Sequence, residues 1–297
     1  MQYNSSRTSP GIAALKEAKG ARLTVFRHQG WYLNMFEISS HEPPAAGTST
    51  GSMKFAYQNG HVKGGWQGGR GWDKQSPHLS DATKPGYIIA GGWMISGARG
   101  ALDAPNEWFF DEKERELFLW PNASGPPIQD FVAVNLKTLF SIQGLNGSDQ
   151  PKAKDITIQG IKMRDAADVS MERWGVPSGG DWGLHRGGAV FFENTEDCTV
   201  SNCTFERLDG NVLFLSGYNR RTLIADNEFS WIGHSCAAAW GYTNEEDGTG
   251  GMQPRFTSLL RNYAREIGII QKQSSFWFQG KACQSIIKDN VLFNGPR

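Results

Sequence analysis

The second half of the sequence repeats one short pattern: an aliphatic residue, two spacers, a residue that is often Asn, one spacer and an apolar residue. The aliphatic positions lie 42, 24, 35 and 28 residues apart. This spacing fits a coil of about 24 residues that sometimes carries an inserted loop, and it predicts a solenoid. The aliphatic positions are Ile158, Val200, Ile224, Leu259 and Ile287.

One such coil cannot fold alone, because a short strand and a turn bury too little apolar area to offset the entropy lost on ordering them. Stacked coils pair each strand in parallel with its copy in the next coil. Asn suits the turn because it tolerates left-handed dihedral angles and bonds to local backbone. We therefore expect Asn227, Asn262 and Asn290 to form a ladder. The alternative is that they are ordinary turn residues of an unrelated β-sheet.

Two successive units align well, residues 188–210 and 212–234. Their near-continuous apolar runs are typical of parallel strands with at least one buried face. The alignment predicts two stacks of side chains across three coils. They are Phe192, Ser216 and Trp240 in one stack, and Asn194, Tyr218 and Tyr242 in the next.

These coils resemble the right-handed parallel β-helix proteins of the pectin-lyase-like group. Within that group the chain is similar to large β-helical glycoside hydrolases of the fucosidase and xylanase type. The resemblance covers roughly residues 131–297, and it implies a fold more firmly than a substrate. The segments that carry it are 179–190, 210–219, 229–233, 239–242 and 273–278.

Residues 1–130 read as a separate β-rich subdomain with hairpins, and residues 131–297 as the β-helix repeats. We expect a short helix over 12–19, a strand pair over 23–26 and 31–38, and a hairpin at 107–120 around a charged tip. Residues 131–134 and 139–142 read as the first strands of the repeats. The chain stops directly after one repeat, so we expect further C-terminal coils to be missing.

Composition limits the classes of partner. Thirty-six glycines and eleven tryptophans favour a turn-rich all-β protein. Lys plus Arg and Asp plus Glu are equal at 30 each, which gives no electrostatic footprint for nucleic acid. No stretch approaches the roughly 20 apolar residues that cross a bilayer, so we expect no membrane span. Residues 1–10 hold no apolar signal core, whereas the resemblance favours an extracellular location.

The four cysteines lack the spacing of a metal site, and all fall where small apolar residues stack. They are Cys198, Cys203, Cys236 and Cys283. Buried free thiols are therefore the expectation. The glycine-rich segment 64–72 is not a dinucleotide or phosphate-loop fingerprint. We expect neither a metal nor a cofactor.

Two long insertions interrupt the repeats, at 164–187 and 244–253. Loops of that length in a compact repeat are usually functional or disordered. Cleavage of a glycosidic bond needs two carboxyl groups, together with groups that hold the sugar. The acids expected near the first long strand and its successors are Glu193, Asp209, Glu245, Glu246 and Asp247.

We predict a glycoside hydrolase that cleaves complex glycans, with an oligo- or polysaccharide as partner. Asp181, Asp209 and His185 are the predicted catalytic residues. Asp209 could instead shape a turn, and the acids at 245–247 could be a solvated loop tip. The predicted substrate-binding residues are Arg186, Trp182, Trp240, Tyr242 and Tyr218.

Two further functions stay open. A polysaccharide lyase would use a base to remove a proton beside a uronate carboxylate. A binding or adhesive β-helix would hold glycans without cleaving them. His234 stands where the relatives that the chain resembles commonly carry an acidic residue, which puts hydrolysis in question.

Overall fold

The computed structural model of the protein describes residues 2–4, 15–26, 33–58, 61–62, 93–122, 131–147, 149–177, 183–244 and 247–296. These residues form an all-β structure with several parallel sheets and one short 3-10 helix, Arg99–Ala101. None of the helices described is long and apolar enough to cross a membrane. The chain divides into two compact units, with the change at residues 131 and 132.

The first unit contains an antiparallel sheet with the strand order β1-β4-β3-β2-β7. The predicted strand pair is confirmed, because Leu23 pairs with Phe36 in antiparallel register. Both side chains are fully buried in the core of this unit, together with Val25 and Ile38. The strands are β1 (Gln2–Asn4), β2 (Arg22–Phe26), β3 (Leu33–Glu42), β4 (Thr50–Phe55) and β7 (Trp93–Ser96), and a separate pair is β5 (Tyr57–Gln58) and β6 (His61–Val62).

The predicted hairpin is also confirmed, as β8 (Trp108–Asp111) paired with β9 (Glu116–Leu119). The predicted helix over 12–19 is wrong over 15–19, the part that the structure describes, since residues 15–18 have no regular structure and 19–20 form a turn. The Glu17 carboxylate accepts hydrogen bonds from the backbone N–H groups of Ala18 and Lys19. Such local bonds compete with helical ones.

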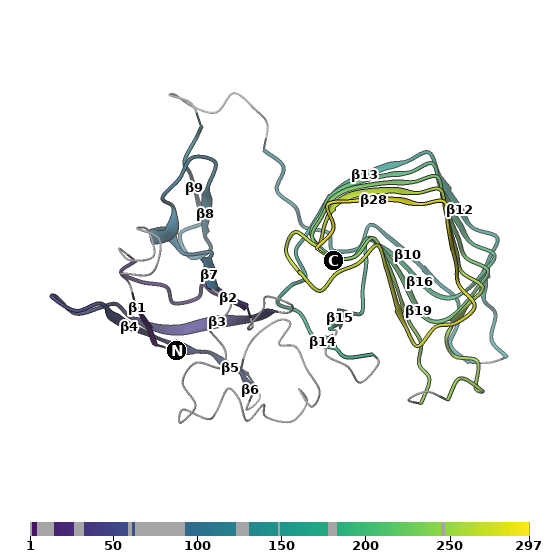
Figure 1. Cartoon of the computed structure of the whole chain (residues 1–297), viewed down its shortest axis with the longest axis horizontal. Coiled ribbons are helices and arrows are strands. Elements are labelled where there is room, and N and C mark those ends of the chain that lie inside the picture. Colours follow the sequence, from purple (N-terminus) through teal and green to yellow (C-terminus); the bar gives the residue numbers. More distant parts are fainter. Residues whose placement is uncertain are drawn as a thin grey trace. The chain divides into compact units, whose positions relative to one another are not determined.

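The second unit consists of coils that each give one strand to each of three parallel sheets. Figure 1 shows these coils overlying one another, with the colour running from teal to yellow. Sheet I has the order β10-β16-β19-β22-β26, sheet II β12-β17-β20-β24-β27 and sheet III β13-β18-β21-β25-β28.

The strands of sheet I are β10 (Phe140–Gln143), β16 (Val190–Glu196), β19 (Leu213–Arg220), β22 (Ala237–Trp240) and β26 (Trp277–Gly280), with β11 (Ala153–Lys154) and β23 (Pro254–Arg255) paired at its side. Those of sheet II are β12 (Thr157–Gln159), β17 (Thr199–Ser201), β20 (Leu223–Ala225), β24 (Ser258–Leu260) and β27 (Ile286–Lys288). Those of sheet III are β13 (Lys162–Ala166), β18 (Thr204–Leu208), β21 (Glu228–Ile232), β25 (Tyr263–Ile267) and β28 (Val291–Phe293).

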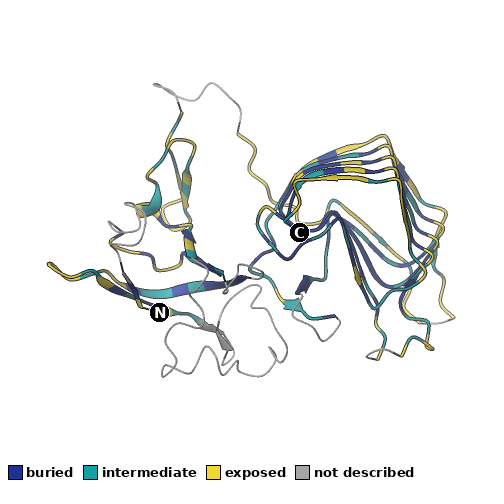
Figure 2. Ribbon diagram, in the orientation of Figure 1, coloured by how far each residue is buried: buried dark blue, intermediate teal, exposed yellow. Residues whose placement is uncertain are grey.

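The repeat read from the sequence is the register of sheet II. Val200 pairs with Ile158 on one side and with Ile224 on the other, and the pairing continues through Leu259 to Ile287. The side chains of Val200, Ile224 and Leu259 are fully buried. Figure 2 shows that the middle coils are mostly buried, while the first and last coils are more exposed. The aliphatic repeat is therefore the core of the second unit.

The predicted asparagine ladder is confirmed at the corner between sheets II and III. The Asn227 side-chain amide donates to Asn262 Oδ1 at 3.0 Å, and the Asn262 amide donates to Asn290 Oδ1 at 2.9 Å. Each Oδ1 also accepts the backbone N–H of the Asn before it, at 3.1 and 2.9 Å. The ladder thus satisfies buried backbone donors that a turn leaves without a strand partner.

A second feature recurs at the corners. Each has a residue with left-handed backbone dihedral angles, and this residue is usually not Gly. At the corner before sheet II, Asp197 and Arg221 have φ of 54° each, and their side chains form a two-pronged ion pair across one coil step. Asp226 and Arg261 repeat this arrangement at the next corner. These pairs are partly exposed, so water and salt screen them and their contribution to stability is small.

In the first predicted side-chain stack on sheet I, the pairing of Ser216 with Trp240 is confirmed, but Phe192 is wrong by one residue. Glu193, not Phe192, pairs with Ser216. The register shifts after Glu193, and Thr195 pairs with Asn219, which leaves one extra residue on β19. Gly217 in this bulge has φ of 57°, a conformation that glycine adopts without strain.

The first predicted entry strand, at 131–134, is also wrong. These residues have no regular structure, and Val132 and Val134 are 63% and 43% exposed. Sheet I instead begins at Phe140, which pairs with Val190 and lies inside the second predicted entry strand, 139–142. All four cysteines are free, and Cys198, Cys203 and Cys236 are buried, as expected.

Candidate functional site

The outer face of sheet I is covered by the first insertion. Alternate residues of this sheet, such as Phe192 and Leu215, point into the core of the coils. Their neighbours Phe191 and Phe214 point outward and stack with ring centroids 6.0 Å apart. Leu184 of the insertion packs against Phe214 in a separate apolar cluster.

The insertion forms a small antiparallel pair of its own, β14 (Trp174–Gly175) with β15 (Leu184–His185). Glycines let it approach the coils closely. A Cβ on Gly175 would collide with the ring of Trp240, and a Cβ on Gly280 would lie 2.8 Å from the Pro177 side chain. The described part of the insertion is therefore packed on sheet I, near β22 and β26.

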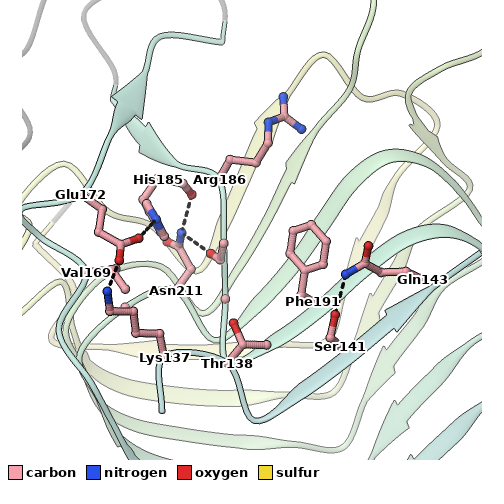
Figure 3. Close-up of a pocket in the computed structure, with 13 residues that line it drawn as sticks. Lys137, Thr138, Ser141, Gln143, Val169, Glu172, His185, Arg186, Phe191 and Asn211 are labelled. Atoms are coloured by element: carbon pink, nitrogen blue, oxygen red, sulfur yellow. Dashed lines mark hydrogen bonds and ion pairs between the residues drawn. The ribbon is translucent and has the colours of Figure 1, made fainter. Parts of the chain in front are cut away.

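A cavity of about 350 Å³ lies between the insertion and the first two strands of sheet I (Figure 3). Polar side chains dominate its lining, with Phe191 as the aromatic surface. The lining residues are Lys137, Thr138, Ser141, Gln143, Val169, Glu172, His185, Arg186, Gly187, Gly188, Phe191, Gly210 and Asn211. Its size is within the range of small-molecule sites.

Glu172 holds the main charged contacts of this cavity. One carboxylate oxygen accepts a hydrogen bond from the Lys137 ammonium, and the other lies 2.8 Å from His185 Nε2. Burial raises the pKa of Glu172, but the bonds from Lys137 and His185 outweigh burial and hold that pKa below its ordinary value. Glu172 is therefore ionised at neutral pH.

Burial lowers the pKa of His185, against the opposing effect of Glu172. The neutral imidazole then donates its Nε2 proton to the carboxylate, which leaves Nδ1 as an acceptor. Nδ1 is buried and has no hydrogen-bond partner among the residues that the structure describes. A Cβ on Gly187 would lie 2.7 Å from His185 Cε1 and 3.1 Å from Nδ1, so the ring packs against Gly187 where a side chain would collide with it.

The turn that carries His185 is fixed to the coils by Asn211. Its amide donates to the carbonyl oxygens of His185 and Gly187, both at 3.0 Å, and its Oδ1 accepts the backbone N–H of Ser235 at 3.3 Å. Asn211 is 2% exposed, so water does not compete for these bonds. The hydrogen bonds of Asn211 thus hold the backbone of His185 in place on the coil beneath it.

His234 also supports the insertion. It is buried, and its Nε2 lies 3.3 Å from Ser170 Oγ, which in turn donates to the Asp168 carboxylate. The Trp174 ring centroid lies 4.9 Å from that of His234 and 6.0 Å from that of His185. His234 therefore takes part in packing beside the cavity rather than lining it.

A second polar cluster surrounds the guanidinium of Arg186. Arg186 Nη1 donates to Ser216 Oγ and to the Trp240 carbonyl oxygen, both at 2.8 Å. Its Cζ lies 4.1 Å from the ring centroid of Trp240 and 4.3 Å from that of Tyr242. Tyr242 and Ser216 both donate to Glu193 Oε1, at 2.6 and 2.9 Å. Burial and the bond to Glu193 raise the pKa of Tyr242.

The structure brings together several of the predicted site residues. His185 and Arg186 line the cavity, and Arg186 contacts Trp240 and Tyr242. Tyr218 lies in a different cluster, where its hydroxyl donates to Glu196 at 2.7 Å and its ring contacts Arg220.

Among the predicted acids, Asp209 directly precedes Gly210 and Asn211, which line the cavity, and its backbone N–H bonds to the Ala166 carbonyl oxygen at 3.4 Å. Asp247 caps its own loop by accepting bonds from Thr249. Asp181, Trp182, Glu245 and Glu246 lie outside the described residues.

Sequence reasoning missed Glu172 and Lys137. Glu172 is 13 residues from His185 and 35 from Lys137, so no short-range spacing connects them. The antiparallel pairing of Trp174 with His185 makes the insertion turn back on itself. An acidic residue next to such a turn in the insertion was the signal from which Glu172 could have been predicted.

Comparisons with known proteins agree at the level of the fold. No family model matches the chain, and no curated protein matches it either. A solved structure entitled "Glycoside hydrolase" is similar over 92% of this chain, with a TM-score of 0.68 and 16% identity. The chain spans about half the length of that protein, 49%. At this identity the likeness establishes a shared all-β fold.

Proposed function

We propose that residues 131–297 form a right-handed parallel β-helix, that residues 1–130 form a β-rich subdomain, and that the protein is a glycoside hydrolase. In this proposal, the cavity on sheet I binds a segment of an oligo- or polysaccharide. The shared fold with a glycoside hydrolase supports the proposal in general terms.

The observation that carries the proposal is the set of groups around Glu172. A carboxylate of depressed pKa, a neutral imidazole and an ammonium group line one cavity beside an aromatic ring. Titratable groups with perturbed pKa values that meet in a cleft are candidates for a functional site. The mixture of hydrogen-bonding groups suits a ligand rich in hydroxyls.

The proposed chemistry gives Glu172 the role of the ionised carboxylate. Hydrolysis of a glycoside needs one carboxylic acid to protonate the leaving oxygen and one carboxylate to act as base or nucleophile. Glu172 suits the second role because it is ionised at neutral pH. Asp209 is the proposed acid, since the two residues that follow it line the cavity.

Elimination from a uronate is the second candidate function. His185 lines the cavity, and burial lowers its pKa, so its imidazole is neutral, as a base that removes a proton must be. Lys137 could offset part of the negative charge of a uronate carboxylate. In this reaction Glu172 would fix the tautomer of His185 instead of attacking the sugar.

One experiment separates the candidates. The protein is incubated with a panel of plant, fungal and animal polysaccharides, and both reducing ends and ultraviolet-absorbing unsaturated products are measured. Hydrolysis predicts reducing ends without absorbing product, and Glu172→Gln should lower the rate by about 100-fold or more.

Glu196→Gln is the matched control, because Glu196 is also held by a lysine, Lys154 at 2.9 Å, but lies in the cluster of Tyr218. It should keep its activity. Equal loss in both variants, or no loss in either, contradicts the role of Glu172. An ultraviolet-absorbing product would show that the reaction is elimination and not hydrolysis. Binding without any product would make the protein a glycan-binding module.

A further inference from the structure

The strongest feature that the proposed function leaves unused is Glu193. Its carboxylate accepts hydrogen bonds from Tyr242 and Ser216, yet it forms no ion pair with any described residue. Other half-buried glutamates of the coils do have cationic partners: Glu196 has Lys154 and Glu206 has Lys162. Glu193 is thus a carboxylate held in place by hydroxyl groups.

We propose that Glu193, oriented by Tyr242 and Ser216, is the centre of a second sugar subsite that continues the cavity along sheet I. This inference rests on the proposed function, because it requires that the cavity binds a glycan. It adds that the glycan is longer than one sugar and that the next unit along is bound through its hydroxyl groups.

The position of Glu193 supports this continuity. It follows Phe191 of the cavity lining by two residues on β16, so both side chains point outward about 6.7 Å apart. In the neighbouring strand it pairs with Gln143, which also lines the cavity, at a strand spacing of about 4.8 Å. Glu193 is therefore the next outward residue beyond the cavity.

The cluster around Glu193 is already assembled without a ligand. Glu193 Oε1 accepts hydrogen bonds from both hydroxyl groups, and Ser216 Oγ accepts one from Arg186 Nη1. These contacts fix one oxygen and leave Oε2 with no hydrogen bond from any residue described. A carboxylate oxygen accepts strongly from a sugar hydroxyl, because charge-assisted hydrogen bonds are stronger than neutral ones.

Recognition at this subsite follows from hydrogen bonding more than from stacking. The Arg186 guanidinium lies over the rings of Trp240 and Tyr242, so it covers one face of each. Tyr242 is still 51% exposed, and its hydroxyl lies 2.6 Å from Glu193. A neutral sugar with free hydroxyls fits this surface better than a uronate, which would bring a second negative charge to Glu193.

The bulge in β19 makes the arrangement possible. A Cβ on Gly217 would lie 2.5 Å from the Tyr242 ring, so the ring reaches Glu193 because this position has no side chain. The shift in register at the bulge also brings Ser216 opposite Glu193. Both hydroxyl partners of Glu193 thus depend on one local irregularity.

The test compares ligand lengths. Oligosaccharides of one to eight sugars from xylan, xyloglucan, rhamnogalacturonan and fucosylated glycans are titrated by NMR against the wild type and Glu193→Gln, Tyr242→Phe and Glu206→Gln. Glutamine keeps the shape and the bonds to both hydroxyls but removes the charge. Glu206→Gln is the matched control, since it also removes the charge of a half-buried glutamate of the coils, on sheet III.

A second subsite predicts that Glu193→Gln weakens longer oligosaccharides about tenfold and leaves the shortest binding ligand unchanged. Tyr242→Phe should act in the same direction, and Glu206→Gln should have no effect at any length. Equal weakening at all lengths, or none at any length, overturns the subsite while the cavity stands. Failure of the wild type to bind any of these glycans overturns the proposed function itself, and the subsite with it.

Discussion

Replacement of Asn262 by Ala tests whether the coils are held together by the asparagine ladder. The Asn262 side chain makes four hydrogen bonds: two from Asn227 to its Oδ1, and two from its Nδ2 to Ile224 O and Asn290 Oδ1. Asn262 is 1% exposed, so water cannot replace them without an opening of the coils. At about 1 kcal/mol per bond, we expect a loss of about 4 kcal/mol.

Urea denaturation at neutral pH, followed by hydrogen exchange of peptides from 199–264, measures this loss within the second unit. Asn290→Ala is the matched control. Asn290 also makes four side-chain bonds, but it is only half-buried, so water can satisfy part of what is lost. We expect about 2 kcal/mol there. A loss for Asn262→Ala below about 1 kcal/mol, or no larger than for Asn290→Ala, would show that the asparagine ladder does not hold the coils together.

Three further predictions concern the site and the core. Because burial lowers the pKa of His185, its neutral form is favoured in the folded state, and stability should fall as pH drops below about 6.5. His185→Gln should flatten this slope in denaturation curves, and an unchanged slope would contradict it. Gly217→Ala should destabilise the protein by at least about 1 kcal/mol in thermal unfolding, and ultraviolet titration should show a lower pKa for Tyr242 than in the wild type. Unchanged stability and an unchanged pKa of Tyr242 would contradict the role given to the bulge. Thiol reagents should label Cys283 before Cys198, Cys203 and Cys236 in the native protein, as mass spectrometry can show, and simultaneous labelling would contradict their burial.

The parallel pairing of successive strands could be predicted from the sequence, because the pattern that indicates it is local and repeated. Val200 and Ile224 lie one coil apart and pair directly, and the asparagines three residues after Ile224 and Leu259 form the ladder. The aliphatic residues mark every coil, and the turn asparagines mark the last three. The hairpin at 107–120 was readable for a similar reason, since a charged tip separates two apolar runs.

The details of the site depend on features that leave no periodic mark. One extra residue at Gly217 shifts Ser216 from Phe192 to Glu193, and a uniform alignment of the units cannot contain that shift. Glu172 meets His185 because the insertion folds back through strands of two residues each. Such short strands have too few residues to show an alternating pattern.

The role of His234 also required the structure. From its position in the sequence it could replace an acid used in catalysis. In the structure it is buried against Trp174 and contacts Ser170, while the depressed-pKa carboxylate at the cavity is Glu172, from the insertion. A histidine at this corner therefore does not remove the carboxylate on which the proposed chemistry rests.

A crystal structure of the protein with an oligosaccharide that binds in the NMR titration would test the proposed site. We expect one sugar in the cavity, within hydrogen-bond distance of Glu172 or His185, and the next sugar beside Glu193. A sugar bound elsewhere on the protein, with the cavity on sheet I filled by water at saturating ligand, would contradict the proposed site.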